Sequence, residues 1–337
     1  MMSDCSAVFV WQVKLGWLAI LMVMLAACAG PVPAPDVQQA HLPDYPIIGA
    51  GGSGNYSPEV KEIIASFREW DHYHDPGGKN PDHRFWTFAK MDRYAQFPVG
   101  KCMPGIWRDL EAIDKIFECD KPIIADVASR YPGAWYQIGN EPNWYPYIRT
   151  DYYAYQFRLY EKYIHELDPT ARLMTGGITL FSADWTDWMG WLLEENLLVD
   201  IWVIHPYAYG WPSGTESAKG TIAEIQSYRA YLDTHGLSDA PILIGEFSDA
   251  SGNSQVAELA KYAQLTTRWL TLNWEAHNII GWYWWGVTTL AMGNAGLFGS
   301  PYSMDTITPV GKAYLQKYDL YYVYLPIIFR SSGKDGQ

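Results

Sequence analysis

Short apolar runs alternate along this chain with longer segments of helical periodicity, and this alternation restricts the fold more than any other feature. The clearest runs are "YPIIGAGG", "AWYQIGNE", "RLMTGGITL", "VDIWVIHPY", "PILIGEF" and "IIGWYWWGV". Between them lie "DYYAYQFRLYEKYIHEL", "AEIQSYRAYLDTHG" and "SQVAELAKYAQLTTRWLTLNW", whose apolar residues recur at three- and four-residue steps. Apolar runs closed by turn residues are typical of parallel strands covered by helices on both faces. The sequence therefore predicts an α/β fold with a parallel sheet.

The spacing of these runs favours a single (β/α)8 barrel, the TIM barrel. The predicted ends of the later strands are Glu141, Thr179, His205, Glu246 and Trp284. Successive ends lie 38, 26, 41 and 38 residues apart, close to the roughly 31 residues per unit of a barrel of about 250 residues. We therefore number these strands four to eight. The 91 residues from Ala50 to Glu141 leave room for three earlier units, and "RFWTFAKM" is one further predicted strand.

A doubly wound open sheet is the alternative, because it also alternates strands and helices. Such sheets carry a glycine fingerprint after the first strand, and Gly49, Gly51 and Gly54 match its spacing. The fingerprint also needs an acidic residue about 20 positions later, at the end of a second strand. Glu69 has that spacing but lies inside "SPEVKEIIASFREW", which we interpret as a helix. The glycines therefore favour a tight turn over a dinucleotide or phosphate site.

Two glutamates follow predicted strands in the same local pattern. Glu141 ends "WYQIGNE" and Glu246 ends "ILIGE", three strand units later. In parallel α/β folds the functional side chains gather at the carboxyl ends of the strands. Two carboxyl groups facing each other there suit glycosidic bond cleavage, in which one donates a proton and the other attacks the anomeric carbon. The alternative for either glutamate alone is a surface carboxylate beside a turn.

Charge and aromatic content narrow the class of partner. The net charge of -13 would repel a phosphate backbone, so a nucleic-acid partner is not expected. The 17 Trp and 25 Tyr residues provide flat rings with a polar edge, which suit stacking on sugar faces. The alternative for any single ring is packing between helices and sheet.

The N-terminal segment has the features of an export signal. Lys14 precedes "LGWLAILMVMLAAC", which is shorter than the roughly 20 residues that span a bilayer. "LAAC" resembles the bacterial lipobox, which implies cleavage before Cys28 and its lipidation. We expect a signal peptide at 1–27, a Pro-rich tether at 28–45, the barrel at 46–318 and an aromatic, apolar tail at 319–337. Ordinary secretion and an uncleaved anchor are the alternatives, and all three place the domain outside the cytoplasm.

Two cysteines remain in the predicted barrel domain, Cys102 and Cys119. In an oxidising compartment two thiols can form a disulfide. The alternative is two unpaired, buried cysteines, because bridging depends on the separation of the Cα atoms. Both interpretations remain open at this stage.

With these motifs together, the chain resembles the retaining glycoside hydrolases of clan A, on "GNEPN" after strand four and "IGEF" at strand seven. The resemblance implies that Glu141 is the acid/base, Glu246 the nucleophile and Asn140 the donor to the sugar 2-hydroxyl. "HPY" on strand six corresponds to a His-x-Tyr of the clan. This implies a subsite role for His205 and contact of Tyr207 with the nucleophile.

The same resemblance assigns a tryptophan of "GWYWWGV" to the floor of a sugar subsite, which is Trp284 or Trp285. Further aromatic residues beyond strand ends are candidate sugar platforms: Trp144, Tyr145, Trp185, Trp188 and Trp211. The implied partner is a β-linked glycan, and no cofactor is expected.

Two other functions are alternatives to glycoside hydrolysis. His72 and His74, flanked by Asp71 and Asp75, have a spacing found in metal-dependent amidohydrolase barrels. That class also needs later metal ligands, and here strand five ends without a histidine while strand eight ends in tryptophans. The other alternative is a non-catalytic glycan-binding lipoprotein on a barrel scaffold, which predicts loss of one glutamate. Both glutamates are present.

Overall fold

The computed structural model describes most of the chain after residue 109 and two short strands before it. The described residues are 47–51, 85–88, 110–130, 132–144, 149–181, 184–208, 213–249, 255–286, 295–300 and 303–316. All of them belong to one compact unit, Ala40–Gln337. The predicted signal peptide, the tether, the helix at 57–70 and the C-terminal tail lie outside these residues. None of the helices in the described part is long and apolar enough to cross a bilayer.

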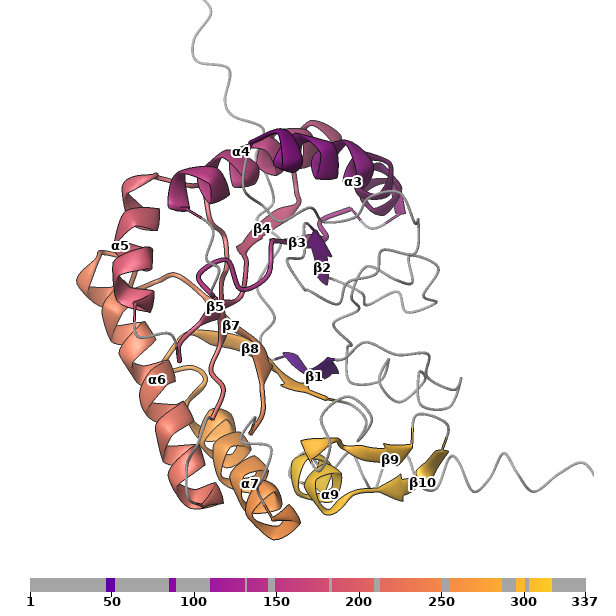
Figure 1. The fold of residues 1–337 in the computed structure, drawn as a ribbon, viewed down its shortest axis with the longest axis vertical. Coiled ribbons are helices and arrows are strands. Elements are labelled where there is room, and N and C mark those ends of the chain that lie inside the picture. The colour runs from indigo at the N-terminus through magenta and orange to yellow at the C-terminus, as the bar shows by residue number, and fades with distance from the viewer. Residues whose placement is uncertain are drawn as a thin grey trace, which may run out of the picture. The chain divides into compact units, whose positions relative to one another are not determined.

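Parallel strands form the centre of the fold (Figure 1). They are β1 (Ile47–Gly51), β2 (Phe85–Phe88), β3 (Trp135–Ile138), β4 (Arg172–Thr175), β5 (Ile178–Thr179), β6 (Trp202–His205), β7 (Ile242–Phe247) and β8 (Ile279–Trp285). One sheet has the order β1-β8-β7-β6-β5 and another the order β2-β3-β4, and every pair in both is parallel. The predicted α/β fold with parallel strands is confirmed.

The predicted strand 172–180 is interrupted at Gly176–Gly177, and this break joins the two sheets. Before it, β4 pairs with β3; after it, β5 pairs with β6. A parallel bridge between Met174 and Ile201 adds a second connection. Strands β1 to β8 therefore form one parallel series, from β2 through β8 to β1. Strands β1 and β8, the first and last of this parallel series along the chain, also pair with each other, as strands of a closed barrel do.

Helices follow the strands on one side of this series. They are α3 (Leu110–Arg130), α4 (Thr150–Leu167), α5 (Trp185–Glu194), α6 (Gly214–Thr234) and α7 (Val256–Asn273). The periodicity predicted α4, α6 and α7, but α3 and α5 were missed. Pro122 inside α3 reads locally as a helix break. Trp185 and Trp188 of α5, candidate sugar platforms by sequence, pack with the core in the structure.

Side chains of the strands alternate between two apolar clusters. The interior cluster contains Trp135, Met174, Ile201, Val203, Leu243, Ile280 and Tyr283. The intervening residues, such as Tyr136, Trp202 and Ile244, pack in the larger cluster with the helices. Because side chains along a strand alternate between its faces, the residue two positions after an interior residue points to the interior again. This rule places His205, two positions after Val203, at the end of the interior.

A short antiparallel hairpin follows β8, formed by β9 (Phe298–Ser300) and β10 (Ser303–Ile307), and leads into α9 (Pro309–Gln316). Helix α9 packs against α7 (Figure 1). Tyr314 of α9 is fully buried, and its ring contacts Phe247 and Trp284. This segment therefore covers the helix side of the last two long strands.

Candidate active site

A β-bulge turns Glu246 toward the interior. Ile244 pairs with Trp282 and Phe247 with Trp284, so two residues of β7 lie opposite one residue of β8. Without this extra residue, strict alternation would place Glu246 and Ile244 on the same, helix-facing side. The bulge shifts the alternation, so Phe247 packs with the helices while Glu246 faces the site. Glu246 is 4% exposed.

Glu141 stands on a tight turn directly after β3. Gly139 has φ +82° and Glu141 has φ +48°, in the left-handed region. That region costs a non-glycine residue roughly 1–2 kcal/mol. The turn is closed by the Trp144 N–H, which donates to the Glu141 carbonyl at 3.0 Å. At this turn the chain leaves the line of β3. Because the conformation of Glu141 is strained, contacts with neighbouring residues must stabilise it.

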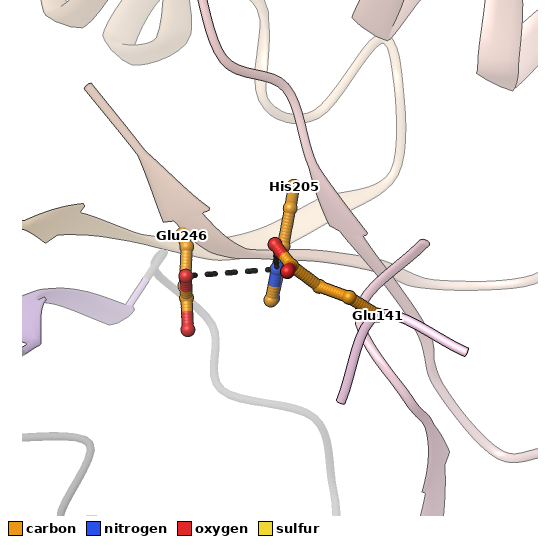
Figure 2. A group of neighbouring side chains, drawn as sticks. All are labelled: Glu141, His205 and Glu246. Atoms are coloured by element: carbon orange, nitrogen blue, oxygen red, sulfur yellow. Dashed lines mark hydrogen bonds and ion pairs between the residues drawn. The ribbon is translucent and has the colours of Figure 1, made fainter. Parts of the chain in front are cut away.

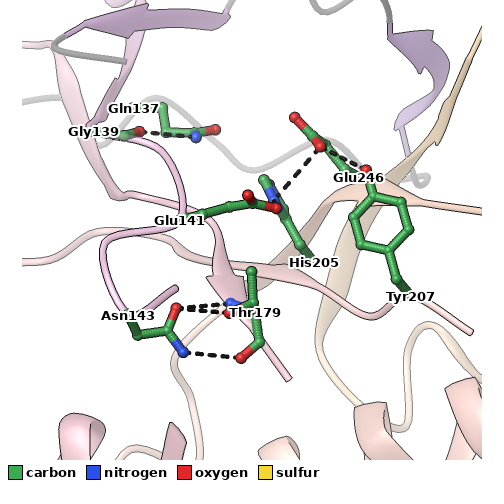
Figure 3. Close-up of polar contacts among 8 residues, drawn as sticks. All are labelled: Gln137, Gly139, Glu141, Asn143, Thr179, His205, Tyr207 and Glu246. Carbon is green, nitrogen blue, oxygen red and sulfur yellow. Dashed lines mark hydrogen bonds and ion pairs between the residues drawn. The ribbon is translucent and has the colours of Figure 1, made fainter. Parts of the chain in front are cut away.

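Asn143 holds that turn against the neighbouring strand (Figure 3). Its amide oxygen accepts from the Thr179 N–H at 2.9 Å and from the Thr179 hydroxyl at 3.1 Å, and its amide nitrogen donates to the Thr179 carbonyl at 2.9 Å. Both residues are buried. Asn143 was not assigned a role from the sequence, although "GNEPN" contains it; the signal is a second asparagine two residues after the glutamate.

Tyr153 of α4 supports the same corner where β3 and β4 stop pairing. Its hydroxyl donates to the Ile138 carbonyl at 2.9 Å and accepts from the Gly176 N–H at 2.7 Å. Burial raises the pKa of Tyr153 well above its ordinary value, so the hydroxyl keeps the proton that it donates. The end of β3 is thereby fixed from the helix side as well.

His205 lies between the two carboxyl groups (Figure 2). Its Nδ1 is 3.0 Å from Glu141 Oε1 and 3.7 Å from Glu246 Oε2, and the side chain is fully buried. Sequence reasoning expected His205 to contact sugar in a subsite. The structure places it instead as a bridge between the two glutamates.

Tyr207 donates its hydroxyl to Glu246 Oε2 at 2.6 Å (Figure 3). A short bond from O–H to a carboxylate oxygen stabilises the ionised carboxylate and fixes its orientation. The predicted contact between Tyr207 and Glu246 is therefore present in the structure.

The two carboxyl groups are close, and they differ in exposure. One oxygen of each, together with a His205 nitrogen, lies within 4.8 Å of the others. The Glu141 side chain is 13% exposed and that of Glu246 is 5% exposed. The three residues could also supply ligands to a metal ion, a role that would replace the His205–Glu141 hydrogen bond with metal coordination.

Asn140 is buried beside Glu141 at 5% exposure. Its amide oxygen has no hydrogen-bond partner among the described residues. A buried amide oxygen left in this state costs free energy, so such groups normally gain a partner from ligand or water. The contact between Asn140 and substrate stays a prediction.

The tryptophans divide according to the face of the strand that carries them. Trp284 is fully buried on the helix side, where its indole N–H donates to the Ala295 carbonyl at 3.0 Å and its ring packs on Phe247 and Tyr262. It therefore cannot form the floor of a subsite, and that expectation is corrected. Trp285, the next residue, is partly buried and packs against the interior cluster. Alternation along β8 leaves Trp285 as the candidate.

Two further tryptophans proposed as platforms belong to the core instead. Trp188 is 3% exposed in α5, and Trp185 of the same helix packs on Tyr228 and Tyr231 of α6. Trp144 differs, because it is 45% exposed and its ring meets Phe181 edge-on at 5.8 Å. Trp144 therefore stays a candidate platform, and Phe181 beside it was not singled out from the sequence.

Several predicted residues lie outside the described part of the chain. They are Cys28, His72, His74, Cys102, Tyr145 and Trp211. Cys119 is described in α3, and it is disulfide-bonded. Its partner falls among the residues outside the description, so pairing with Cys102 stays a prediction.

The sequence matches no protein-family model and no curated protein. Among solved structures, it is similar to the GH53 catalytic domain of Ignisphaera aggregans, at 14% identity and a TM-score of 0.49, over 85% of this chain and 98% of that one. It is also similar to a monomeric β-xylosidase from Caulobacter crescentus (14% identity, TM-score 0.45, 60% of this chain, 46% of that one). A glucosidase from Croceicoccus marinus gives 13% identity and a TM-score of 0.49, over 73% of this chain and 55% of that one.

The chain thus spans about half the length of the last two proteins. At these scores and identities the similarities assign neither a family nor an activity to this chain.

Proposed function

We propose that this protein is a retaining glycoside hydrolase that cleaves β-glycosidic bonds, with Glu141 as acid/base and Glu246 as nucleophile. One observation carries the proposal: a carboxylate oxygen of each residue lies within 4.8 Å of the other, at the ends of two different parallel strands. Retaining enzymes hold their carboxyl groups about 5–5.5 Å apart, whereas inverting enzymes need about 6.5–9.5 Å to admit a water molecule. The short separation favours retention.

The contacts of each carboxyl group support its assigned role. Glu246 accepts a hydrogen bond from the Tyr207 hydroxyl at 2.6 Å, which stabilises the ionised carboxylate and fixes its orientation, as suits a nucleophile. Glu141 is the more exposed, which suits a group that must reach a leaving oxygen and later a water molecule. Asn140, buried beside Glu141, would donate to the sugar 2-hydroxyl beside the bond that breaks.

The reaction then proceeds in two displacements. Glu246 attacks the anomeric carbon while Glu141 gives its proton to the departing glycosidic oxygen, so the leaving group departs as an alcohol and a glycosyl ester forms on Glu246. Glu141, now ionised, takes a proton from water as that water attacks the same carbon. The ester bond to Glu246 breaks, both glutamates return to their starting states, and the sugar keeps its β configuration.

The proposal includes a closed (β/α)8 barrel and an extracytoplasmic location. Closure is supported by the single parallel series of strands and by the pairing of β1 with β8. Membrane attachment rests on the lipobox-like "LAAC" that ends at Cys28. A Cys28→Ser variant should leave the membrane fraction or remain unprocessed, and unchanged membrane partitioning would contradict the anchor.

Azide rescue with a dinitrophenyl β-glycoside tests the two roles separately. Glu141→Ala should still release dinitrophenolate in a burst, because this leaving group needs little protonation, and azide should restore turnover with a β-glycosyl azide as product. Glu246→Ala should be inactive, and any product formed with azide should be the α-anomer. Glu216→Gln, which changes an exposed glutamate of α6, is the matched control and should retain full activity.

Retention itself is checked by NMR of the first product released from a panel of purified β-glycans. An inverted first product, or azide products of the opposite anomers, would refute the role assignment.

The same protein and glycan panel distinguish glycoside hydrolysis from two alternatives, metal-dependent chemistry and glycan binding without catalysis. Loss of hydrolysis on treatment with EDTA, and its recovery with Zn²⁺, would instead favour metal-dependent chemistry at Glu141, His205 and Glu246. Binding to a glycan without release of any oligosaccharide would favour the non-catalytic glycan-binding protein.

A further inference from the structure

Two glycines on the strands beside β6 border the imidazole of His205. Gly177 lies just before β5, and Gly245 lies within β7; these are the two strands that pair with β6. Neither glycine has a positive φ, so the backbone at both positions accepts any L-residue. Glycine is therefore needed at these positions because a side chain would meet a neighbouring group, and not because of the backbone conformation.

The space is occupied by the imidazole ring. A Cβ at Gly177 would lie 1.9 Å from Nε2, 2.2 Å from Cε1 and 2.4 Å from Cδ2 of His205, and these are its three nearest atoms. A Cβ at Gly245 would lie 2.6 Å from Val203 Cγ1 and 3.0 Å from His205 Nε2. One edge of the ring thus rests on bare backbone at Gly177, while Nδ1 faces Glu141 at 3.0 Å.

We propose that Gly177 and Gly245 form a slot that positions His205 between the two glutamates, with Gly177 as the decisive positioning residue. The inference rests on the proposed function for its catalytic meaning. A methyl group at Gly177 would force the ring to move by about 1.5 Å to restore van der Waals separation. A shift of that size breaks a 3.0 Å hydrogen bond unless Glu141 follows. Glu141 would then lose the hydrogen bond with His205 Nδ1 that orients it.

The test is a double-mutant cycle between Gly177→Ala and His205→Ala in the full-length protein. With His205 present, Gly177→Ala should lower kcat about 10- to 100-fold, the range expected when a catalytic group is displaced by about 1 Å. In the His205→Ala background the same substitution should change kcat less than about twofold, because the atoms that it would meet are gone.

Gly176→Ala is the matched control, since its Cβ would meet Ile138 and Gly139 backbone atoms and Pro142, not His205. Its effect should be the same in both backgrounds.

A second readout does not depend on activity. The downfield NMR resonance of the proton shared by His205 Nδ1 and Glu141, identified by its loss in His205→Ala, should also be lost or shifted in Gly177→Ala and kept in Gly176→Ala. If Gly177→Ala does not fold but the double variant does, the slot is supported, because the methyl group is tolerated once the ring is removed.

Equal losses in stability from Gly177→Ala in both backgrounds, or an unchanged resonance, would overturn the proposal. If the wild-type protein hydrolyses no glycoside, the proposed function is refuted. The slot is then still tested by the NMR resonance and by the stability of the variants, measured as their urea unfolding midpoints.

Discussion

Replacing Asn143 with alanine should release the turn that carries Glu141 while leaving every catalytic side chain in the sequence. Asn143 makes three hydrogen bonds to Thr179, a residue 36 positions away on the neighbouring strand segment. Because Glu141 has a left-handed φ of +48°, its conformation depends on contacts made by the rest of the turn. The expected result is a loss of both stability and turnover.

The magnitude follows from the groups left without partners. Thr179 is fully buried, so its N–H and carbonyl would each lose a partner in a site with little water. An unsatisfied buried donor or acceptor costs roughly 1–3 kcal/mol, and water entering the vacated volume recovers part of this. We therefore expect Asn143→Ala to lower the free energy of unfolding by about 2–4 kcal/mol. Asn143→Asp keeps the acceptor but sets an oxygen against the Thr179 carbonyl, so it should also destabilise.

Urea unfolding followed by tryptophan fluorescence measures the stability, and dinitrophenyl glycoside hydrolysis measures the turnover. Asn273→Ala is the control, because that amide makes one hydrogen bond, to Trp269 of its own helix, and its loss should cost less than about 1 kcal/mol. Equal effects of the two substitutions on stability, or an unchanged kcat in Asn143→Ala, would refute the view that Asn143 secures Glu141.

Tyr207→Phe should lower kcat about 10- to 100-fold without unfolding the protein, because it removes one charge-assisted hydrogen bond to Glu246; wild-type kcat would exclude a catalytic role. Glu141→Gly should be more stable to urea than Glu141→Ala by about 1 kcal/mol, reversing the usual order of these residues, since glycine adopts φ +48° without strain. Burial raises the pKa of Glu224 to about 7, so between about pH 4.5 and 7 the folded state holds a proton that the unfolded state has released, and stability falls as the pH rises. Glu224→Gln should remove this dependence of stability on pH and stabilise the protein at pH 8 by about 1–2 kcal/mol. If the variant and the wild-type protein lose stability in parallel as the pH rises, the raised pKa does not belong to Glu224. Peptide mass spectrometry without reduction should link Cys119 to Cys102, and a different partner would correct the pairing.

Local pattern predicted the strands and the neighbourhood of the site. The runs before Glu141 and Glu246 are buried strands, and parallel pairing brings their carboxyl ends to one edge of the sheet. These features depend on short-range periodicity and on the common direction of parallel strands, and both can be inferred from short segments of the sequence.

Which of two consecutive residues faces the interior was decided by the tertiary structure. In "GWYWWGV" every residue near the strand end is aromatic, so the letters do not reveal that Trp284 faces the helices and Trp285 the interior. The same holds for Glu246, which reaches the interior because a bulge in the pairing with β8 shifts the alternation by one residue.

Contacts between distant segments were decided in the same way. The bonds from Asn143 to Thr179, and the packing of His205 on Gly177, join side chains to backbone on neighbouring strands. The sequence by itself determined which segments become strands and where each one ends, because periodicity and turn residues act over a few positions. Only the tertiary structure decided which side chains meet, because register, bulges and the space beside a glycine depend on the strand that lies alongside.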